Sequence, residues 1–441
     1  MWCGALADII AREAGMRRLA PLFLLLVLPL APACRGRSLP SSVTDPVRIG
    51  VVLPQTGGLA QDGQAWVRAV RLAADEVNAA GGLLGGRRVE LIVVDSATDS
   101  NAGVHGAQMV VDQHAAVVIG DGGSGGSLAI YQMVTHTAGV PQISGSATSS
   151  SLTVANAALP AAERYFFRTA PPDGYQAQVV DRIATMNAHC THLAVLFQND
   201  AYGLPFAMGI ANLFSAHGTL AAMVAFTPAQ ASYATETAMV SASMPDCVAL
   251  IAYPQDAGVI LRNWEITTGH PTVHWIGTDG LFSADFLREA GSDARVDGFL
   301  GASPLTTPDT PEFQDFSARY HAAYGHDPEN FTASYYDATA LALLAIERAG
   351  TTDGAMIRDA LREIGGPNGM LVVHAARLRE ALAALQQAHP FPLNYQGASG
   401  PIDFNMNGDT VAPYEIWTIT GMPAAFSQLA VVQATDLTVL P

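Results

Sequence analysis

The feature that most constrains the fold is a regular alternation of short apolar runs with amphipathic helical segments. The runs at 47–54 and 89–96 are rich in Val, Ile and Leu and have the length of a strand. The segment 61–80 between them carries apolar residues at helical spacing and stops at Gly81 and Gly82. Repeated along the chain, this pattern predicts parallel sheets covered by helices on both faces.

The pattern occurs in two series. The first adds apolar runs at 115–120 and 140–144 and helices at 103–114 and 127–138. The second has its helices and apolar runs at 174–188, 191–197, 204–217, 221–226, 232–243, 247–253, 256–268 and 273–279. The predicted fold class is therefore α/β, with two doubly wound parallel-sheet lobes, several chain crossings that form a hinge, and a ligand cleft between the lobes.

The last third of the chain is expected to complete both lobes. Four helices are predicted without strands between them, at 311–324, 332–349, 353–364 and 375–388. They are expected to cover the first lobe, whereas the run 414–420 is expected to return to the second lobe as a strand. The predicted first lobe comprises 47–171 and 303–410, and the second lobe comprises 172–302 and 411–441.

Residues 16–34 have the features of an export signal. A positive pair precedes the apolar stretch 19–30, which is shorter than a membrane span, and small residues follow up to Cys34. The end of this stretch resembles a bacterial lipobox, which predicts cleavage before Cys34 and a lipid on that residue. Residues 1–37 would then be a signal and linker region.

Several points about this region stay open. Pro32 departs from the lipobox pattern, so plain secretion is one alternative, and an uncleaved membrane anchor is another. Met16 makes a better start than Met1 because the positive pair then stands at the front. No stretch outside this region has the roughly 18 uninterrupted apolar residues of a membrane span.

Charge and cysteine usage restrict the partners and cofactors. The formal net charge is −17 with only 22 Lys and Arg, which argues against nucleic acid because binding a polyanion requires a basic surface. Cys190 and Cys247 each stand just before an apolar run, so one disulfide between neighbouring strands is expected in an exported chain. Two unpaired buried thiols are the alternative. The 12 His are scattered, and we expect neither a metal site nor a cofactor.

The stretch 118–128 contains the spacing G-x-G-x-x-G at Gly120, Gly122 and Gly125, which is typical of dinucleotide sites. It lies on the third strand of its series rather than the first, and no acid follows the next strand to hold a ribose. A nucleotide-dependent enzyme is therefore the weaker interpretation. The sequence also shows no nucleophile elbow and no evident catalytic triad. A small anion such as a carboxylate fits this loop as well as a phosphate does.

Polar side chains follow strands in both series. In the first, the hydroxyls of Ser124, Ser146 and Thr148 could bind one carboxylate, although a solvated Ser-rich turn would read the same way. The second series offers aromatic and acidic residues for an ammonium group, namely Tyr202, Tyr253, Asp279 and Asp173. Turn chemistry and ordinary packing are the alternatives for each one alone. Together the two sets predict a cleft complementary to an amino-acid zwitterion.

The sequence resembles the type I periplasmic substrate-binding proteins, and is most similar to the leucine/isoleucine/valine-binding proteins of ABC transporters. The resemblance runs from about Val47 to Thr420 and rests on stretches that include "IGVVLPQTGGLAQDGQ", "GVPQISGSAT", "FQNDAYGLPFA" and "WIGTDGLFS". At matching positions it implies these ligand contacts: the carboxylate on Ser124, Ala147 and Thr148, the ammonium on Asp279 and Asp173, and aromatic walls from Tyr202 and Phe331.

Asp62 departs from that pattern, because branched-chain binders carry an aromatic residue in this loop. An acid here favours a ligand with a polar or cationic side chain. Alternatively, Asp62 caps the following helix. Both interpretations stay open from the sequence.

The resemblance implies a monomeric, periplasmic, lipid-anchored binding protein that is not an enzyme. It would bind an amino acid or similar small solute and deliver it to an ABC permease by hinge closure. The alternative is a sensor subunit for an amide, urea-type or other small solute.

Overall fold

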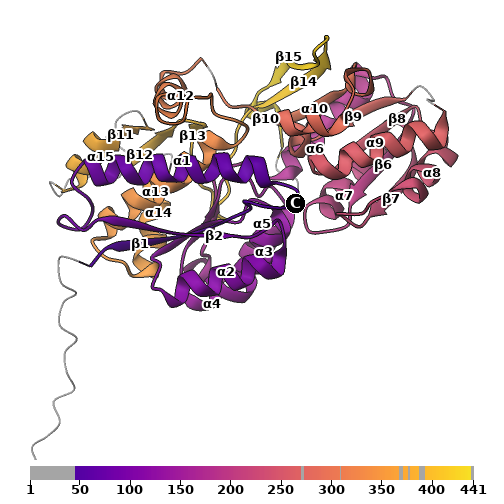
Figure 1. Cartoon of the computed structure of the whole chain (residues 1–441). Helices are drawn as coiled ribbons and strands as arrows, with labels where there is room; N and C mark the ends of the chain where they lie inside the picture. Colours follow the sequence, from indigo (N-terminus) through magenta and orange to yellow (C-terminus); the bar gives the residue numbers. More distant parts are fainter. Residues whose placement is uncertain are drawn as a thin grey trace, which may run out of the picture. The chain divides into compact units, whose positions relative to one another are not determined.

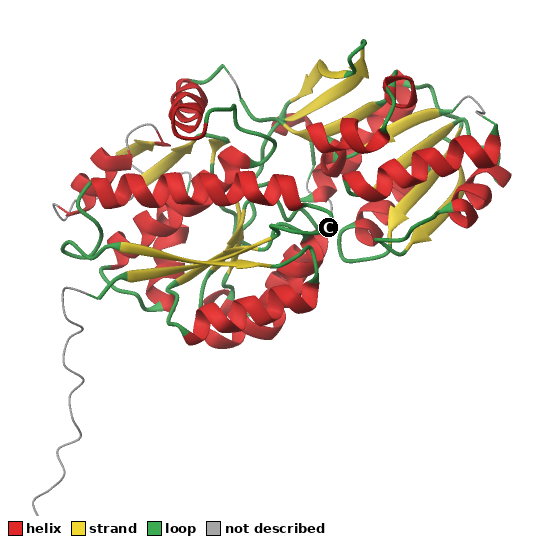
Figure 2. Ribbon diagram, in the orientation of Figure 1, coloured by secondary structure: helices red, strands yellow, loops and turns green. Residues whose placement is uncertain are grey.

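The computed structural model describes residues 45–269, 273–307, 309–366, 371–375, 378–386 and 393–438. Within these ranges the chain forms two α/β lobes, each built on its own sheet (Figure 1, Figure 2). Both predicted series of strands and helices are present, which confirms the predicted fold class.

The first lobe is built on a five-stranded parallel sheet with the order β2-β1-β3-β4-β5. Its strands are β1 (Val47–Leu53), β2 (Val89–Asp95), β3 (Val117–Gly120), β4 (Gln142–Ser144) and β5 (Phe166–Arg168). Because all five run in the same direction, the loops that follow them open on one edge of the sheet. This is the edge at which open α/β sheets bind their ligands.

Helices cover both faces of this sheet. On one face, α1 (Ala60–Ala79) packs beside α13 (Thr332–Ala349), and the predicted apolar side of α1 is buried. On the other face lie α2 (Ser100–Asp112) and α3 (Ser124–Ile130). The remaining helices of this lobe are α4 (His136–Ala138), which α3 reaches through a π-helical turn, α5 (Ser150–Ala157), α12 (Pro311–Tyr324), α14 (Gly354–Ile364) and α15 (Leu378–Gln386). Since α12, α13 and α15 contact α1, and α14 contacts α13, the prediction that the later helices cover the first lobe is confirmed.

A small additional sheet corrects one sequence prediction. Strand β11 (Leu371–His374) lies between α14 and α15 and pairs with β12 (Leu393–Gly397), which in turn pairs with β13 (Gly400–Pro401). The expectation that no strands separate the later helices is therefore wrong. Strands of two to five residues are too short for their periodicity to be distinguished from that of helices or loops.

The second lobe contains a seven-stranded sheet with the order β15-β14-β10-β9-β8-β6-β7. Its strands are β6 (His192–Gln198), β7 (Thr219–Phe226), β8 (Cys247–Ile251), β9 (His274–Gly277), β10 (Leu300–Pro304), β14 (Tyr414–Thr420) and β15 (Ala425–Val432). Strands β6 to β10 are parallel, whereas β14 and β15 are antiparallel and form one edge. The predicted return of 414–420 to the second lobe is thus confirmed.

Alternation along β6 explains how this sheet is covered on both faces. Val195 and Phe197 point to the core shared with α6 (Asp173–Arg182) and α7 (Gly203–Phe214), while Ala194 and Leu196 point to the opposite core. The helices on that opposite face are α8 (Ala234–Ala242), α9 (Pro254–Thr268), α10 (Ala284–Ala290) and α11 (Asp293–Val296). A strand buried on both faces reads as a continuous apolar run, as seen in the sequence.

Within the described chain, the backbone passes between the lobes after β5, after β10 and after β13. The predicted lobe limit at 302/303 falls inside β10, which pairs with β14 of the second sheet as far as Pro304. The lobe limits as a whole remain a proposal.

Candidate functional site

A cavity of about 30 Å³ is lined by residues of both lobes, close to the carboxyl ends of their strands. Among the predicted ligand-binding residues, those that line it are Asp62, Ser124, Ser146, Thr148, Tyr202, Tyr253, Asp279 and Phe331. Gly122, from the predicted anion-binding loop, also lines it, and the lining residues that were not predicted are Leu59, Trp66, Gly280, Phe282, Ser283 and Asn330.

The hydroxyl groups of the first lobe are not equally available to a ligand. Ser124 Oγ accepts a hydrogen bond from the Ser149 amide at 3.2 Å, so its own hydrogen is free to donate. Ser146 Oγ donates to the Gly122 carbonyl at 2.8 Å and lies 2.9 Å from the Tyr335 hydroxyl. Thr148 is buried and lines the cavity. Ser124 and Thr148 are thus better placed than Ser146 to donate to a carboxylate.

Ala147 does not line the cavity. Its side chain is buried in a small cluster with Tyr131, Leu152 and Phe166. Its amide already donates to Ser144 Oγ at 3.0 Å. The structure therefore gives no geometric support to the ligand contact that the resemblance implied for this residue.

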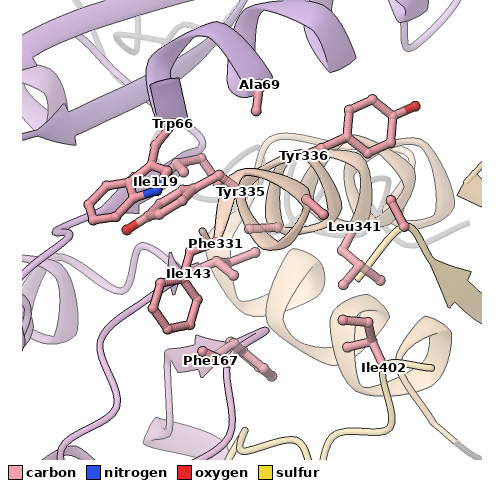
Figure 3. Packing of buried hydrophobic residues seen from close by; sticks show 14 of the residues in the cluster. Trp66, Ala69, Ile119, Ile143, Phe167, Phe331, Tyr335, Tyr336, Leu341 and Ile402 are labelled. Atoms are coloured by element: carbon pink, nitrogen blue, oxygen red, sulfur yellow. The ribbon is translucent and has the colours of Figure 1, made fainter. Parts of the chain in front are cut away.

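The glycine-rich loop after β3 accommodates an aromatic ring. A Cβ atom on Gly122 would lie 2.3 Å from the ring of Trp66, so only glycine allows this approach. Figure 3 shows Trp66 against Tyr335 of α13, and their ring centroids are 4.9 Å apart in a stacked arrangement. Gly122 thus has a packing reason that needs no pyrophosphate.

A buried arginine holds the loop after β4 in position. Arg168, at the end of β5, is fully buried and pairs with Asp409 at 2.7 Å. Its guanidinium also donates to the carbonyls of Ala147 at 3.1 Å and Ser149 at 2.9 Å, and to Thr153 Oγ1 at 2.5 Å. Because these partners flank Thr148, the network determines where the hydroxyl side of the cavity lies.

The second lobe contributes a buried acid with a tyrosine partner. The Tyr202 hydroxyl donates to Asp279 Oδ1 at 2.9 Å and lies 2.8 Å from Thr278 Oγ1. Burial raises the pKa of Asp279 to about 6. Tyr253 stacks on Tyr202 with ring centroids 5.4 Å apart and planes at 2°. A carboxylate beside two aromatic rings is suited to hold an ammonium group.

Asp173 lies behind the cavity wall rather than in it. Its amide donates to the Thr148 carbonyl at 2.8 Å, which links the start of α6 to the hydroxyl loop. Neither carboxyl oxygen has a described hydrogen-bond partner within 3.5 Å, and the Thr148 hydroxyl is the neighbouring polar group that acts to lower its pKa. Burial and, secondarily, the charge of Asp279 raise the pKa of Asp173 well above its usual range. Asp173 is therefore expected to be protonated when Asp279 is ionised.

Asp62 lies in the first turn of α1 and faces the cavity. Its side chain makes no capping hydrogen bond to the helix, and Oδ1 has no partner among the described residues. Burial, followed by the charges of Glu329 and Asp285, raises the pKa of Asp62 to about 7. The capping interpretation thus has no hydrogen bond to support it.

The two cysteines of the second lobe are joined. Cys190 and Cys247 form a disulfide with Cα atoms 5.8 Å apart, and Cys247 opens β8 beside β6. Together with Asp246 they make a cluster with metal-ligand atoms, but both sulfurs are consumed by the bridge. Cys34 and the whole predicted export signal lie outside the described residues. Among those that are described, no helix combines the length and apolarity needed to cross a bilayer.

Comparison with known proteins identifies the family to which this chain belongs. A family model described as periplasmic binding protein matches residues 46–389. The chain belongs to the periplasmic binding protein family. Members of this family are exported solute-binding proteins and not enzymes, so the enzyme alternative for the glycine loop is not supported.

Relatives of this periplasmic binding protein carry branched-chain amino acid names. The Leu/Ile/Val-binding protein BraC3 of Rhizobium johnstonii is 28% identical over 315 residues, which is 70% of this chain and 81% of the relative. Leucine binding protein LivK from Thermotoga maritima has a TM-score of 0.73 at 22% identity, covering 89% of this chain and 100% of that one. A solute binding protein from R. palustris in complex with benzoate has a TM-score of 0.68 at 19% identity, covering 88% and 96%. The two structures show a shared fold.

Proposed function

We propose that this protein binds an α-amino acid as a zwitterion in the cavity between its lobes and delivers it to an ABC permease. The observation that carries the proposal is the separation of donors and acids across one cavity. The first lobe supplies the Ser124 and Thr148 hydroxyls, and the second supplies Asp279 with its Tyr202 partner. A carboxylate suits the first side and an ammonium suits the second.

Hinge closure is the proposed mechanism. In this structure the two sides of the cavity already touch, since Ser149 Oγ donates to the Ala201 carbonyl at 2.5 Å and Asn330 Nδ2 donates to the Asp279 carbonyl at 3.4 Å. A ligand that contacts both lobes binds most tightly when they are together, and so it shifts the population toward that arrangement. The proposed site of membrane attachment is a lipid on Cys34, and the proposed functional unit is a monomer.

An aromatic carboxylate such as benzoate is a weaker candidate ligand. It has a group for the hydroxyl side but no cation for Asp279. Placing an anion in a cavity with buried acids and no basic lining residue is electrostatically unfavourable.

Ligand-induced stabilisation tests the proposed function. Thermal unfolding of the purified protein is followed with amino acids, their amides, the matching carboxylic acids without the amino group, and benzoates. A ligand at about 100 times its Kd stabilises the native state by about 2.7 kcal/mol. Stabilisation by an amino acid, but not by its amide or its des-amino acid, supports the proposal. Stabilisation by benzoates alone refutes it.

A further inference from the structure

Asp62 is a buried acid without a protein partner at a wall of the cavity. Its side chain is 6% exposed, and its Oδ1 accepts no hydrogen bond from a described residue. A carboxyl group in this state is unfavourable unless a ligand supplies the missing donor. The position therefore calls for a ligand group that can donate a hydrogen bond.

The charged residues around Asp62 do not provide its carboxylate with a cationic partner. The acids that act on it most strongly are Glu329, from the segment before α13, and Asp285, from α10. Asp285 already pairs with Arg288 at 2.5 Å, and Arg288 also donates to Gln61 Oε1 at 2.8 Å. Arg68 and His326 lower the pKa of Glu329, and neither is among the groups that act on Asp62. Both charges that act on Asp62 are therefore negative, whereas Asp285 and Glu329 each have an arginine nearby.

Asp62 is electrostatically separate from the proposed ammonium site. The pair of acids at that site is Asp279 and Asp173, and the charge of Asp279 raises the pKa of Asp173. Asp62 instead responds to Glu329 and Asp285, which come from other elements. The cavity therefore offers two acids in two different electrostatic surroundings.

The walls beside Asp62 suit a hydrocarbon stem. Leu59 and Trp66 come from the same end of α1, and Phe331 comes from the start of α13. Trp66 stands four residues after Asp62, which places both on one side of the helix. Its indole N–H is already used by the Asn330 carbonyl at 2.9 Å, so the ring offers only apolar surface and a π-face.

From these contacts we propose that Asp62 is the specificity-determining residue for a cationic side chain, and that the ligand is a diamino acid of the lysine or ornithine type. The inference rests on the proposed function, since the ligand's backbone is taken to be an α-amino acid. Asp279 holds the α-ammonium, the apolar walls enclose the methylene stem, and Asp62 holds the terminal ammonium. In such a ligand the carboxylate faces the hydroxyl-lined side of the cavity, and each of the two ammonium groups faces one acid.

The test compares lysine and ornithine with norleucine, which has the lysine stem without its terminal ammonium. Isothermal titration calorimetry at pH 7.5 is performed on the wild type, Asp62→Asn and the control Glu329→Gln. Glu329 is a neighbouring acid that does not line the cavity. We expect the wild type to bind lysine or ornithine at least tenfold more tightly than norleucine. Asp62→Asn is expected to weaken only the cationic ligands, by about 10- to 100-fold, and Glu329→Gln to change them less than threefold.

The possible failures are distinguishable. If norleucine or leucine binds the wild type more tightly than lysine and ornithine do, the assignment of Asp62 is overturned while the amino-acid function stands. Equal weakening of charged and uncharged ligands by Asp62→Asn also overturns it, because the effect is then structural. If no amino acid binds, the proposed function fails and this inference fails with it. Circular dichroism of each variant identifies any loss of fold.

Discussion

Replacement of Arg168 by methionine is the sharpest test of how the cavity is held in place. Methionine keeps much of the apolar stem and removes the guanidinium. The wild-type side chain has no exposed surface and pairs with Asp409, which is 2% exposed. The same guanidinium serves the Ala147 and Ser149 carbonyls. Arg168→Met therefore leaves one carboxylate and two carbonyls without this donor.

The expected loss of stability follows from the burial of the pair. Removing one partner of a buried ion pair typically costs about 3–5 kcal/mol, because the remaining charge cannot return to water. The matched control is Arg48→Met. Arg48 pairs with Glu90 at 3.1 Å, but their side chains are 38% and 50% exposed, so that pair should contribute at most about 1 kcal/mol.

Urea denaturation followed by tryptophan fluorescence measures both free energies of unfolding. Loss from Arg168→Met of no more than the Arg48→Met loss would refute the reasoning. The double variant Arg168→Met/Asp409→Leu should recover part of the stability, because no lone buried charge remains. We also expect Arg168→Met to weaken ligand binding, since the guanidinium positions the loop that carries Thr148.

Four further predictions concern the site and the second lobe. Asp279→Asn should lower the affinity for the amino acid by about 10- to 100-fold and leave the affinity for its des-amino analogue unchanged. Equal losses of affinity for the two ligands, measured by calorimetry, would contradict the ammonium role. Ser124→Ala should reduce the binding free energy of the amino acid by about 1–3 kcal/mol and that of its amide by less. A greater loss of binding free energy for the amide would exclude a carboxylate contact. Since burial raises the pKa of Asp279 to about 6, the ionised form is present above that pH, and affinity should fall by about tenfold from pH 7 to pH 5; a flat titration would show that this charge does not take part. The Cys190–Cys247 bridge closes a sequence separation of 57, so the double serine variant should lose about 4 kcal/mol by urea denaturation, and labelling of either thiol in the unreduced, unfolded protein would disprove the bridge.

Some parts of the site could have been found from the sequence and were not. Trp66 is one of the apolar residues of the helix predicted at 61–80; it is buried, and its ring also lines the cavity. Its spacing of four residues from Asp62 was the available signal. Asn330 and Ser283 carried no such signal, because they lie in connections whose course depends on how α10 and α13 are placed.

Local periodicity determined the architecture. The order of the predicted strands and helices in both series, the return of β14 and the position of α12 follow from residues that lie close together in the chain. A strand buried on both faces and an amphipathic helix each leave a pattern within about ten to fifteen residues. The same pattern predicted hydroxyls on one lobe and acids on the other.

Only the tertiary structure decided what each side chain is free to do. Ser146 and Ala147 stand in the same short loop as Thr148, yet the first has already donated its hydroxyl hydrogen and the second has already donated its amide. The sequence around Asp62 is compatible both with a helix cap and with a ligand contact, and the surroundings of its side chain distinguish the two. Its lack of a partner depends on α1, α10 and the start of α13 meeting at one point, and contacts between elements far apart in the chain leave no periodic trace in a single sequence.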